Sequence, residues 1–143
     1  MTAGYSGTPL ADKLGLKRGM RCWFHNMPDS VRAEIDPERA EVEEQPTASD
    51  GLQCAHLFVT ERARFERELA AVRPLMAPNG FIWVSWPKKA AKTDTDLTED
   101  VIREIALPTG LVDIKVCAVD ATWSGLKLVI RKENRFTEPS HKP

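Results

Sequence analysis

The strongest constraint on how this chain folds is a pair of almost wholly apolar segments separated by an amphipathic one. Residues 52–59 (LQCAHLFV) and 81–86 (FIWVSW) have the length and continuity of strands that are covered on both faces of a sheet. The intervening segment has four apolar residues at helical spacing, which are Phe65, Leu69, Val72 and Met76. This strand–helix–strand order predicts a right-handed βαβ unit with two parallel, buried strands.

The flanking segments continue the alternation of helices and strands. The first part of the chain predicts a helix at 10–14, a strand at Arg21–His25, a brief helix at 31–35 capped by Asp29 or Ser30, and at most a short edge strand within 40–44. The intervening helix is expected to be capped by Thr60 and to be followed by a turn at 78–80. The last part of the chain predicts a helix from 96 that ends at 108–110, and a β-hairpin with strands 112–118 and 126–130. The expected fold is therefore α/β, a three-layer Rossmann-like domain whose mostly parallel sheet ends in an antiparallel β-hairpin. We assign residues 1–131 to one domain and residues 132–143 to a flexible charged tail.

Composition excludes several classes of protein. The 20 basic and 21 acidic residues give a net charge of −1, which argues against a dedicated nucleic-acid or polybasic membrane binder. The apolar run 81–86 is far shorter than the roughly 18 residues of a membrane span, and the first residues lack the pattern of a signal peptide. Cys22, Cys54 and Cys117 have neither metal-ligand nor redox-motif spacing, so we expect buried, reduced thiols, no metal site and a cytoplasmic protein.

The expected sheet also predicts where a ligand would bind. Ligands of such sheets lie beyond the carboxyl ends of the strands, where segments 26–30, 60–61, 86–94 and 120–125 should gather. The candidate ligand-binding residues are Ser85, Trp86, Lys88, Lys89, Asp94, Trp123, Ser124 and Lys127. The two lysines beside an aromatic wall suit an anion, and Trp123 offers an opposite wall. The alternatives are that the tryptophans simply cover strand ends and that the lysines are solvated. No residue is assigned a catalytic role.

The order of elements over residues 20–131 resembles the class I S-adenosylmethionine-dependent methyltransferase core. This resemblance implies a methyltransferase-type Rossmann-like fold, with a glycine-rich turn after the first strand and an acidic residue at the end of the second. Segment 25–30 contains no glycine, and Pro28 lacks a backbone donor. Only Glu41, Glu43 or Glu44 is placed to supply the acid. We therefore expect no cofactor.

A second resemblance rests on five motifs: GYSGTPL at 4–10, WVSWPKK at 83–89, TDLTED at 95–100, TWSGLK at 122–127 and RKENR at 131–135. Together they resemble a bacterial family of small uncharacterised proteins, a domain-of-unknown-function family. The resemblance implies a bacterial, cytoplasmic protein with a methyltransferase-like fold, and it implies no particular reaction.

These observations favour a non-catalytic Rossmann-like domain that binds a small anionic ligand or a partner protein at the carboxyl edge of the sheet. The alternative is a degenerate or divergent S-adenosylmethionine-dependent methyltransferase, or another small transferase. The absent glycine-rich loop weighs against an enzyme but leaves the question open. The partner is an unknown small molecule or protein, and a homo-oligomer is possible through the exposed edge of the hairpin at 126–130.

Overall fold

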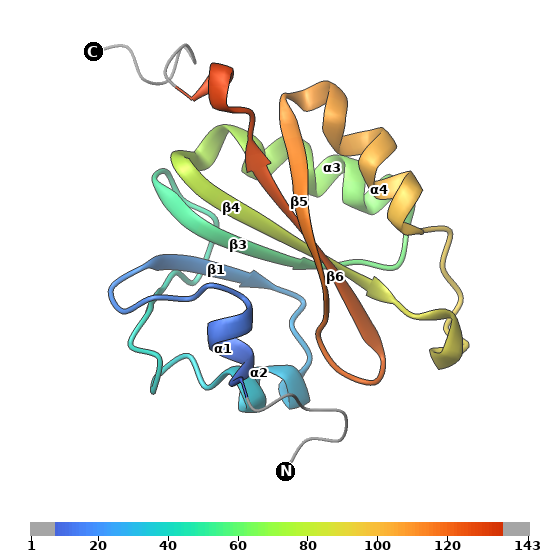
Figure 1. The fold of residues 1–143 in the computed structure, drawn as a ribbon, viewed down its shortest axis with the longest axis horizontal. Coiled ribbons are helices and arrows are strands. Elements are labelled where there is room, and N and C mark those ends of the chain that lie inside the picture. Colours follow the sequence, from blue (N-terminus) through green and yellow to red (C-terminus); the bar gives the residue numbers. More distant parts are fainter. Residues whose placement is uncertain (1–7, 136–143) are drawn as a thin grey trace.

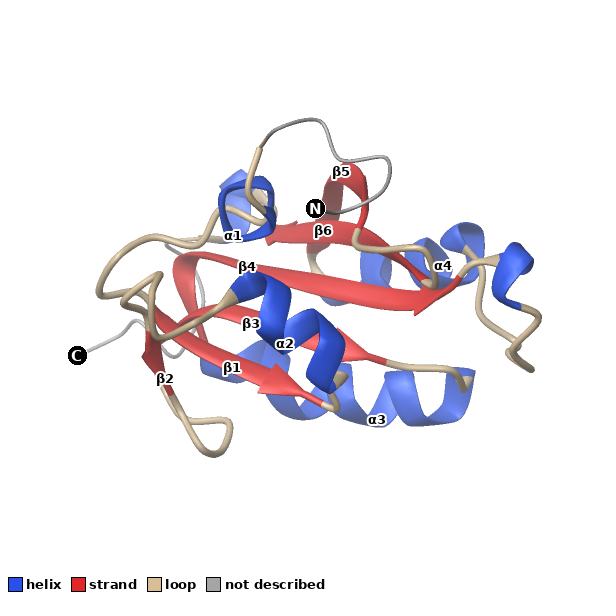
Figure 2. Cartoon of the chain, turned by 90° about the horizontal axis from the view of Figure 1, so that it is seen from below, coloured by secondary structure: helices blue, strands red, loops and turns tan. Residues whose placement is uncertain are grey.

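The two apolar segments form the parallel strands β3 (Leu52–Phe58) and β4 (Met76–Pro87) at the centre of the sheet. The structure is a computed structural model that describes residues 8–135. Strands β1 (Arg21–His25) and β2 (Glu43–Glu44) lie on one side of this pair, and β6 (Trp123–Ile130) and β5 (Leu111–Ala118) lie on the other (Figures 1 and 2). The order is β2-β1-β3-β4-β6-β5, and β6 runs antiparallel to both neighbours. The mostly parallel sheet with a terminal hairpin confirms the predicted fold class.

Helices cover both faces of the sheet and complete the three layers (Figures 1 and 2). On one face, α3 (Arg62–Val72) and α4 (Glu99–Ala106) bury Phe65, Leu69 and Ile102 against the central strands. On the other face, α1 (Leu10–Lys13) and α2 (Asp29–Ile35) belong to a second cluster that contains Val31 and Phe81. Each face of the sheet thus has its own apolar core, as expected for strands without polar alternation.

The predicted turn at 78–80 is wrong, because β4 runs through it. Gly80 lies where the chain passes close to β3, and a side chain there would come within 2.9 Å of the carbonyl oxygen of Leu52. The strand register also shifts between Leu52 and Cys54. The glycine therefore serves close packing between two strands, whereas in the sequence it has the signature of a turn.

The helix ends differ from the predicted ones by a few residues. Pro28 rather than Asp29 or Ser30 precedes α2, and Glu61 rather than Thr60 precedes α3. Thr98 caps α4, since its hydroxyl accepts a hydrogen bond from the backbone N–H of Val101 at 3.2 Å. Short 3₁₀ turns lie at Arg73–Leu75, Lys89–Ala91, Leu107–Thr109 and Lys132–Asn134.

The hairpin differs from its prediction in which strand is exposed. Strand β6 is an interior strand between β4 and β5, so the segment 126–130 is not an edge, and the outer strand is β5. A register shift between Asp113 and Lys115 interrupts the alternation of β5, which leaves Ile114 55% and Val116 50% exposed. Formation of a homo-oligomer through the hairpin stays a prediction, and the strand that would carry it is β5.

The remaining sequence-based expectations concern thiols, membranes and chain ends. Cys22, Cys54 and Cys117 are free and buried, as predicted. No helix within residues 8–135 is long and apolar enough to cross a membrane. Residues 4–7 of the first motif and residues 136–143 of the predicted tail lie outside the described part of the chain. Division into one domain and a tail therefore stays a prediction.

Candidate functional site

The carboxyl ends of β1 and β3 mark the point where the chain leaves the sheet in two directions. After β1 the chain enters α2 on one face, and after β3 it enters α3 on the opposite face. The two strands are direct neighbours, and both point toward the right of Figure 1. Such a switch point leaves a gap between diverging loops, which is the usual ligand position of open α/β sheets.

A crevice of about 340 Å³ occupies this switch point. Its lining residues, which define what we call the switch crevice, are Asn26, Phe58, Val59, Thr60, Glu61, Arg64 and Trp123. The volume lies near the lower end of the range of about 300–1,000 Å³ found for small-molecule sites. Asn26, Thr60, Glu61 and Trp123 come from three of the four segments that the sequence places at this edge. Phe58, Val59 and Arg64 were not predicted, because the sequence indicates core strand residues at 58 and 59 and a solvent-exposed helix residue at 64.

The floor of the switch crevice is aromatic and rests on a buried polar pair. Phe58 and Trp123 meet edge to face, with ring centroids 5.1 Å apart, and His56 stacks on Phe58 at 4.4 Å. Below them Nε2 of His56 and Oγ of Ser85 share a hydrogen bond of 2.7 Å, with both residues fully buried. Burial lowers the pKa of His56 to about 3, so the imidazole is neutral at physiological pH. The floor is therefore uncharged and well packed.

The rim of the switch crevice carries a cation from α3. Arg64 is half exposed and lies 3.9 Å from the Glu68 carboxylate one turn further along the helix. The other contact of Glu68 is with β1, because its Oε2 lies 2.8 Å from Nε2 of His25. Glu68 thus links the end of β1 to the helix that supplies Arg64, which holds this side of the rim together.

The turn after β1 bends without a glycine. Asn26 adopts a left-handed backbone conformation with φ of 58°, a region that asparagine tolerates better than most residues. The chain can therefore turn away from the sheet at the position where the methyltransferase resemblance requires a glycine. Pro28 then precedes α2.

The three glutamates considered for an acid at the end of the second strand do not reach the switch crevice. Glu44 pairs in register with Cys22, three residues before the end of β1, and its carboxylate binds Arg32 through two contacts of 2.8 and 2.6 Å. Glu41 lies 3.6 Å from Arg18, and Glu43 is exposed. Glu61, which follows β3, is the acid that lines the crevice.

A second cleft of about 450 Å³ lies at the carboxyl end of β4. Its lining residues, which define what we call the lysine cleft, are Trp86, Pro87, Lys88, Lys89, Thr93, Thr95, Leu97, Thr98 and Glu99. The two spaces are neighbours: the hydroxyl of Thr95 donates a hydrogen bond of 2.6 Å to the carbonyl of Thr60. The backbone N–H of Lys88 likewise donates to the carbonyl of Thr122 at 2.8 Å, next to Trp123.

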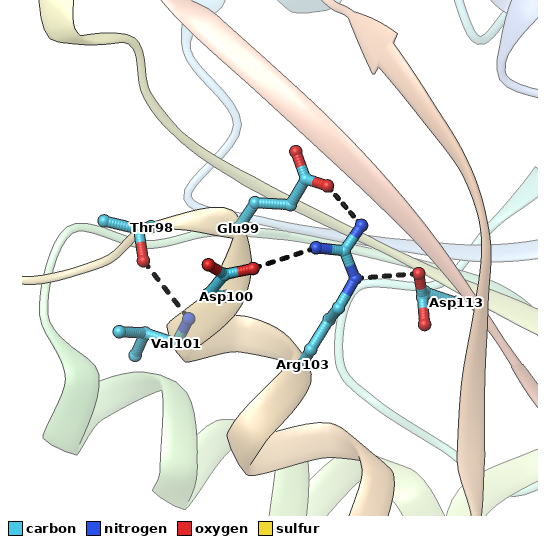
Figure 3. A network of polar contacts seen from close by, with 6 residues as sticks. All are labelled: Thr98, Glu99, Asp100, Val101, Arg103 and Asp113. Atoms are coloured by element: carbon cyan, nitrogen blue, oxygen red, sulfur yellow. Dashed lines mark hydrogen bonds and ion pairs between the residues drawn. The ribbon is translucent and has the colours of Figure 1, made fainter.

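The acidic side chains near the lysine cleft are gathered by one arginine. Arg103 of α4 contacts Glu99, Asp100 at 3.2 Å and Asp113 of β5 at 2.9 Å (Figure 3). Its hydrogen bonds with Asp113 and Glu99 raise the pKa of Arg103, and the same contact lowers the pKa of Asp113. The carboxylate of Glu99 therefore turns toward Arg103 and is neutralised by it.

The structure separates the residues that the sequence analysis proposed as one site. Trp86, Lys88 and Lys89 line the lysine cleft, whereas Trp123 lines the switch crevice. Ser85 is buried beneath the crevice, and Asp94 is exposed without lining either space.

Ser124 and Lys127 lie further along β6. Ser124 pairs in register with Trp86 and is half-buried. Lys127 pairs with Trp83 in mid-strand, and its ammonium lies 4.3 Å from the centre of the Phe81 ring. Burial lowers the pKa of Lys127, and repulsion from the nearby Lys115 lowers it further. This lysine therefore belongs to the face covered by α1 and lines neither space at the strand ends.

A further cavity lies away from this edge of the sheet. This cavity of about 610 Å³ lies between α1 and α2 and is lined by side chains of both charges, among them Asp12, Arg18 and Arg39. It lies beside the loop that precedes β1, away from the carboxyl ends of the strands. Within residues 8–135 no three histidine, cysteine, aspartate or glutamate side chains are placed to hold a metal ion.

Comparison with known proteins identifies the fold. No protein-family model and no curated protein matches this sequence. Among solved structures, an S-adenosylmethionine (SAM) dependent methyltransferase from Aquifex aeolicus aligns with a TM-score of 0.57 and 13% identity, covering 85% of this chain and 88% of that one. Magnesium protoporphyrin IX methyltransferase from Synechocystis PCC 6803 with bound SAM aligns with a TM-score of 0.55 and 9% identity, covering 85% and 74%.

LepI in complex with SAM aligns with a TM-score of 0.55 and 11% identity over 87% of this chain, which spans about half (47%) of the LepI chain. At these identities the three structures show the fold alone, and that fold is the methyltransferase-type Rossmann-like fold. They also correct the preferred functional hypothesis from the sequence, a non-catalytic module for a small anion or a partner protein. The three aligned proteins hold SAM or depend on it, which agrees better with the alternative from the sequence, a degenerate or divergent SAM-dependent methyltransferase or another small transferase.

Proposed function

We propose that this protein is a divergent SAM-dependent methyltransferase that binds its cofactor in the switch crevice. The observation that carries the proposal is the crevice itself: a space of about 340 Å³ with an aromatic floor and a charged rim, at the switch point of a methyltransferase-type sheet. The sequence-based objections were the missing glycine and the backbone donor that Pro28 lacks. The left-handed conformation of Asn26 bears on the first objection, because it turns the chain at the place where the glycine is expected.

The side chains of the crevice fit the chemistry of SAM, which combines a purine, a ribose, a sulfonium and an amino-acid end. Phe58 and Trp123 offer aromatic surface to the purine and to the sulfonium cation. Arg64 is the partner for the carboxylate, as guanidinium groups pair well with carboxylates. Glu61 and Asn26 supply acceptors and donors for the ammonium and the ribose hydroxyls.

When bound, SAM supplies a methyl group activated by the positive sulfur. The contribution of this chain is to hold the reacting partners in place and to limit water at the transfer point. The fully buried His56–Ser85 pair keeps the floor beneath Phe58 fixed, and the hydrogen bond from Thr95 to Thr60 ties the crevice to the neighbouring cleft. We assign no general base, because a methyl acceptor that is nucleophilic at neutral pH needs none.

We propose in addition that the protein is bacterial and cytoplasmic, as the motif resemblance implies. Support for a reducing compartment comes from Cys22, Cys54 and Cys117, which are free and buried.

Isothermal titration calorimetry of the full chain with SAM tests the proposed function. We expect saturable binding by the wild type and a rise in Kd of about 30-fold in Trp123→Ala, equivalent to ~2 kcal/mol. Trp123→Phe keeps an aromatic wall and should retain most of the affinity, and circular dichroism of both variants shows whether the fold is preserved. The proposal would be contradicted if the wild type released no heat of binding at millimolar SAM and equilibrium dialysis also detected no bound SAM.

A further inference from the structure

The lysine cleft has an uncompensated positive charge, although acidic residues surround it. The carboxylate of Glu99, its one acidic lining residue, is bound by Arg103, as are Asp100 and Asp113 (Figure 3). The carboxylate of Asp96 also has a partner outside the cleft, since its Oδ1 accepts a hydrogen bond of 2.7 Å from the backbone N–H of Arg62. Within the described residues, neither Lys88 nor Lys89 has a carboxylate partner. The cleft thus presents two free ammonium groups.

The other side chains of the cleft complete a site for a small anionic group. Thr93 adds a hydroxyl donor to the two ammonium groups, and the buried indole of Trp86 forms an apolar wall. Lys88 is held at its backbone by the hydrogen bond to Thr122, so one of the two cations stands on a fixed strand end. Ammonium and hydroxyl groups together are the partners that phosphate and carboxylate oxygens prefer.

The position of the cleft gives this anion site a place in the proposed reaction. The Thr95–Thr60 hydrogen bond and the Pro87–Trp123 register pair form a wall that the lysine cleft shares with the switch crevice. A molecule anchored in the cleft would therefore have its other end beside the crevice. Resting on the proposed function, we propose that the lysine cleft is the acceptor subsite, and that the methyl acceptor carries a phosphate or carboxylate group held by Lys88 and Lys89.

The test is a titration of the ¹⁵N-labelled full chain with inorganic phosphate, and separately with acetate, followed by amide chemical shifts at constant ionic strength. We expect saturable shifts confined to residues 86–99, and the anion that saturates at lower concentration identifies the group on the acceptor. The double variant Lys88→Gln/Lys89→Gln should weaken this binding at least about tenfold. Lys92→Gln is the matched control, because Lys92 lies in the same loop but does not line the cleft.

Shifts that never saturate with either anion, or that are weakened equally by Lys92→Gln, would overturn the proposal. The same double variant should bind SAM with unchanged affinity, because neither lysine lines the switch crevice. A wild type that binds phosphate in the cleft but does not bind SAM would overturn the proposed function and the acceptor role with it, while leaving an anion site. A wild type that binds SAM but neither anion would overturn the acceptor proposal alone.

Discussion

The switch crevice and the lysine cleft lie side by side at one edge of the sheet, but the floor of the first is aromatic and uncharged, whereas the lining of the second is charged. The crevice rests on Phe58, Trp123 and a buried neutral pair, His56 and Ser85. The cleft is bordered by exposed charges, and its acid is neutralised by Arg103. Buried packing defines a fixed shape, whereas exposed charges supply an attraction that salt screens within about 10 Å. Under the proposed function, this difference would leave shape recognition of the cofactor to the crevice and charge recognition of the acceptor to the cleft.

The largest expected difference between the two regions appears in acid, because only the crevice rests on a buried histidine. In the unfolded chain His56 binds a proton below its ordinary pKa of 6.5, but in the folded protein it does so only near 3. The unfolded state therefore binds more protons between these values, and this term lowers stability as pH falls. We expect a loss of about 4–5 kcal/mol from pH 6.5 to 3.

Urea unfolding from pH 7 to pH 4 measures this slope, and His56→Gln is the comparison. Glutamine keeps a hydrogen-bonding partner for Ser85 but does not titrate, so the variant should lose about 1.4 kcal/mol per pH unit of the wild-type slope. Identical slopes for the two proteins would show that the floor of the crevice is not the acid-sensitive element.

An intermediate effect is expected at the rim of the crevice. Arg64→Ala removes the guanidinium assigned to the carboxylate of SAM, and we expect Kd for SAM to rise about tenfold, or ~1.4 kcal/mol. Arg67→Ala is the matched control, since Arg67 is exposed on the same helix and does not line the crevice. Calorimetry that gives equal affinities for the two variants would remove Arg64 from the site.

The smallest effect is expected beside the lysine cleft. Asp113→Asn removes one of the carboxylates that bind Arg103, and because the pair is only partly buried and Arg103 keeps two other carboxylate partners, we expect the melting temperature to fall by only about 2 °C. Asp113 has a lowered pKa, so its stabilising effect is present above its unfolded-state pKa and is lost as pH falls through the lower folded value. The melting temperatures of the wild type and the variant should differ in low salt and become equal in high salt, which screens the ion pair. A lower melting temperature of the variant that persists in high salt would mean that Asp113 stabilises the fold by packing.

The sequence predicts the sheet well and the site only in part. Segments 52–59 and 81–86 have no polar alternation, so they are central strands in any arrangement. The edge segments containing Asn26, Thr60 and Trp123 follow from the strand order, because parallel strands share a carboxyl edge. The separation of Trp86 from Trp123 does not follow, since it depends on the register of β6 against β4, which sets the two side chains against different apolar cores. The exposure of Ile114 depends likewise on a bulge that has no local sequence signal.

The measurement that tests the central claim most directly is the location of bound SAM on the ¹⁵N-labelled full chain. We expect saturable amide shifts concentrated at residues 26, 58–61, 64 and 123, with the indole resonance of Trp123 among them. Saturable shifts at residues 86–99 in place of these would move the cofactor to the lysine cleft. No saturable shift anywhere would contradict the account of this protein as a SAM-dependent methyltransferase.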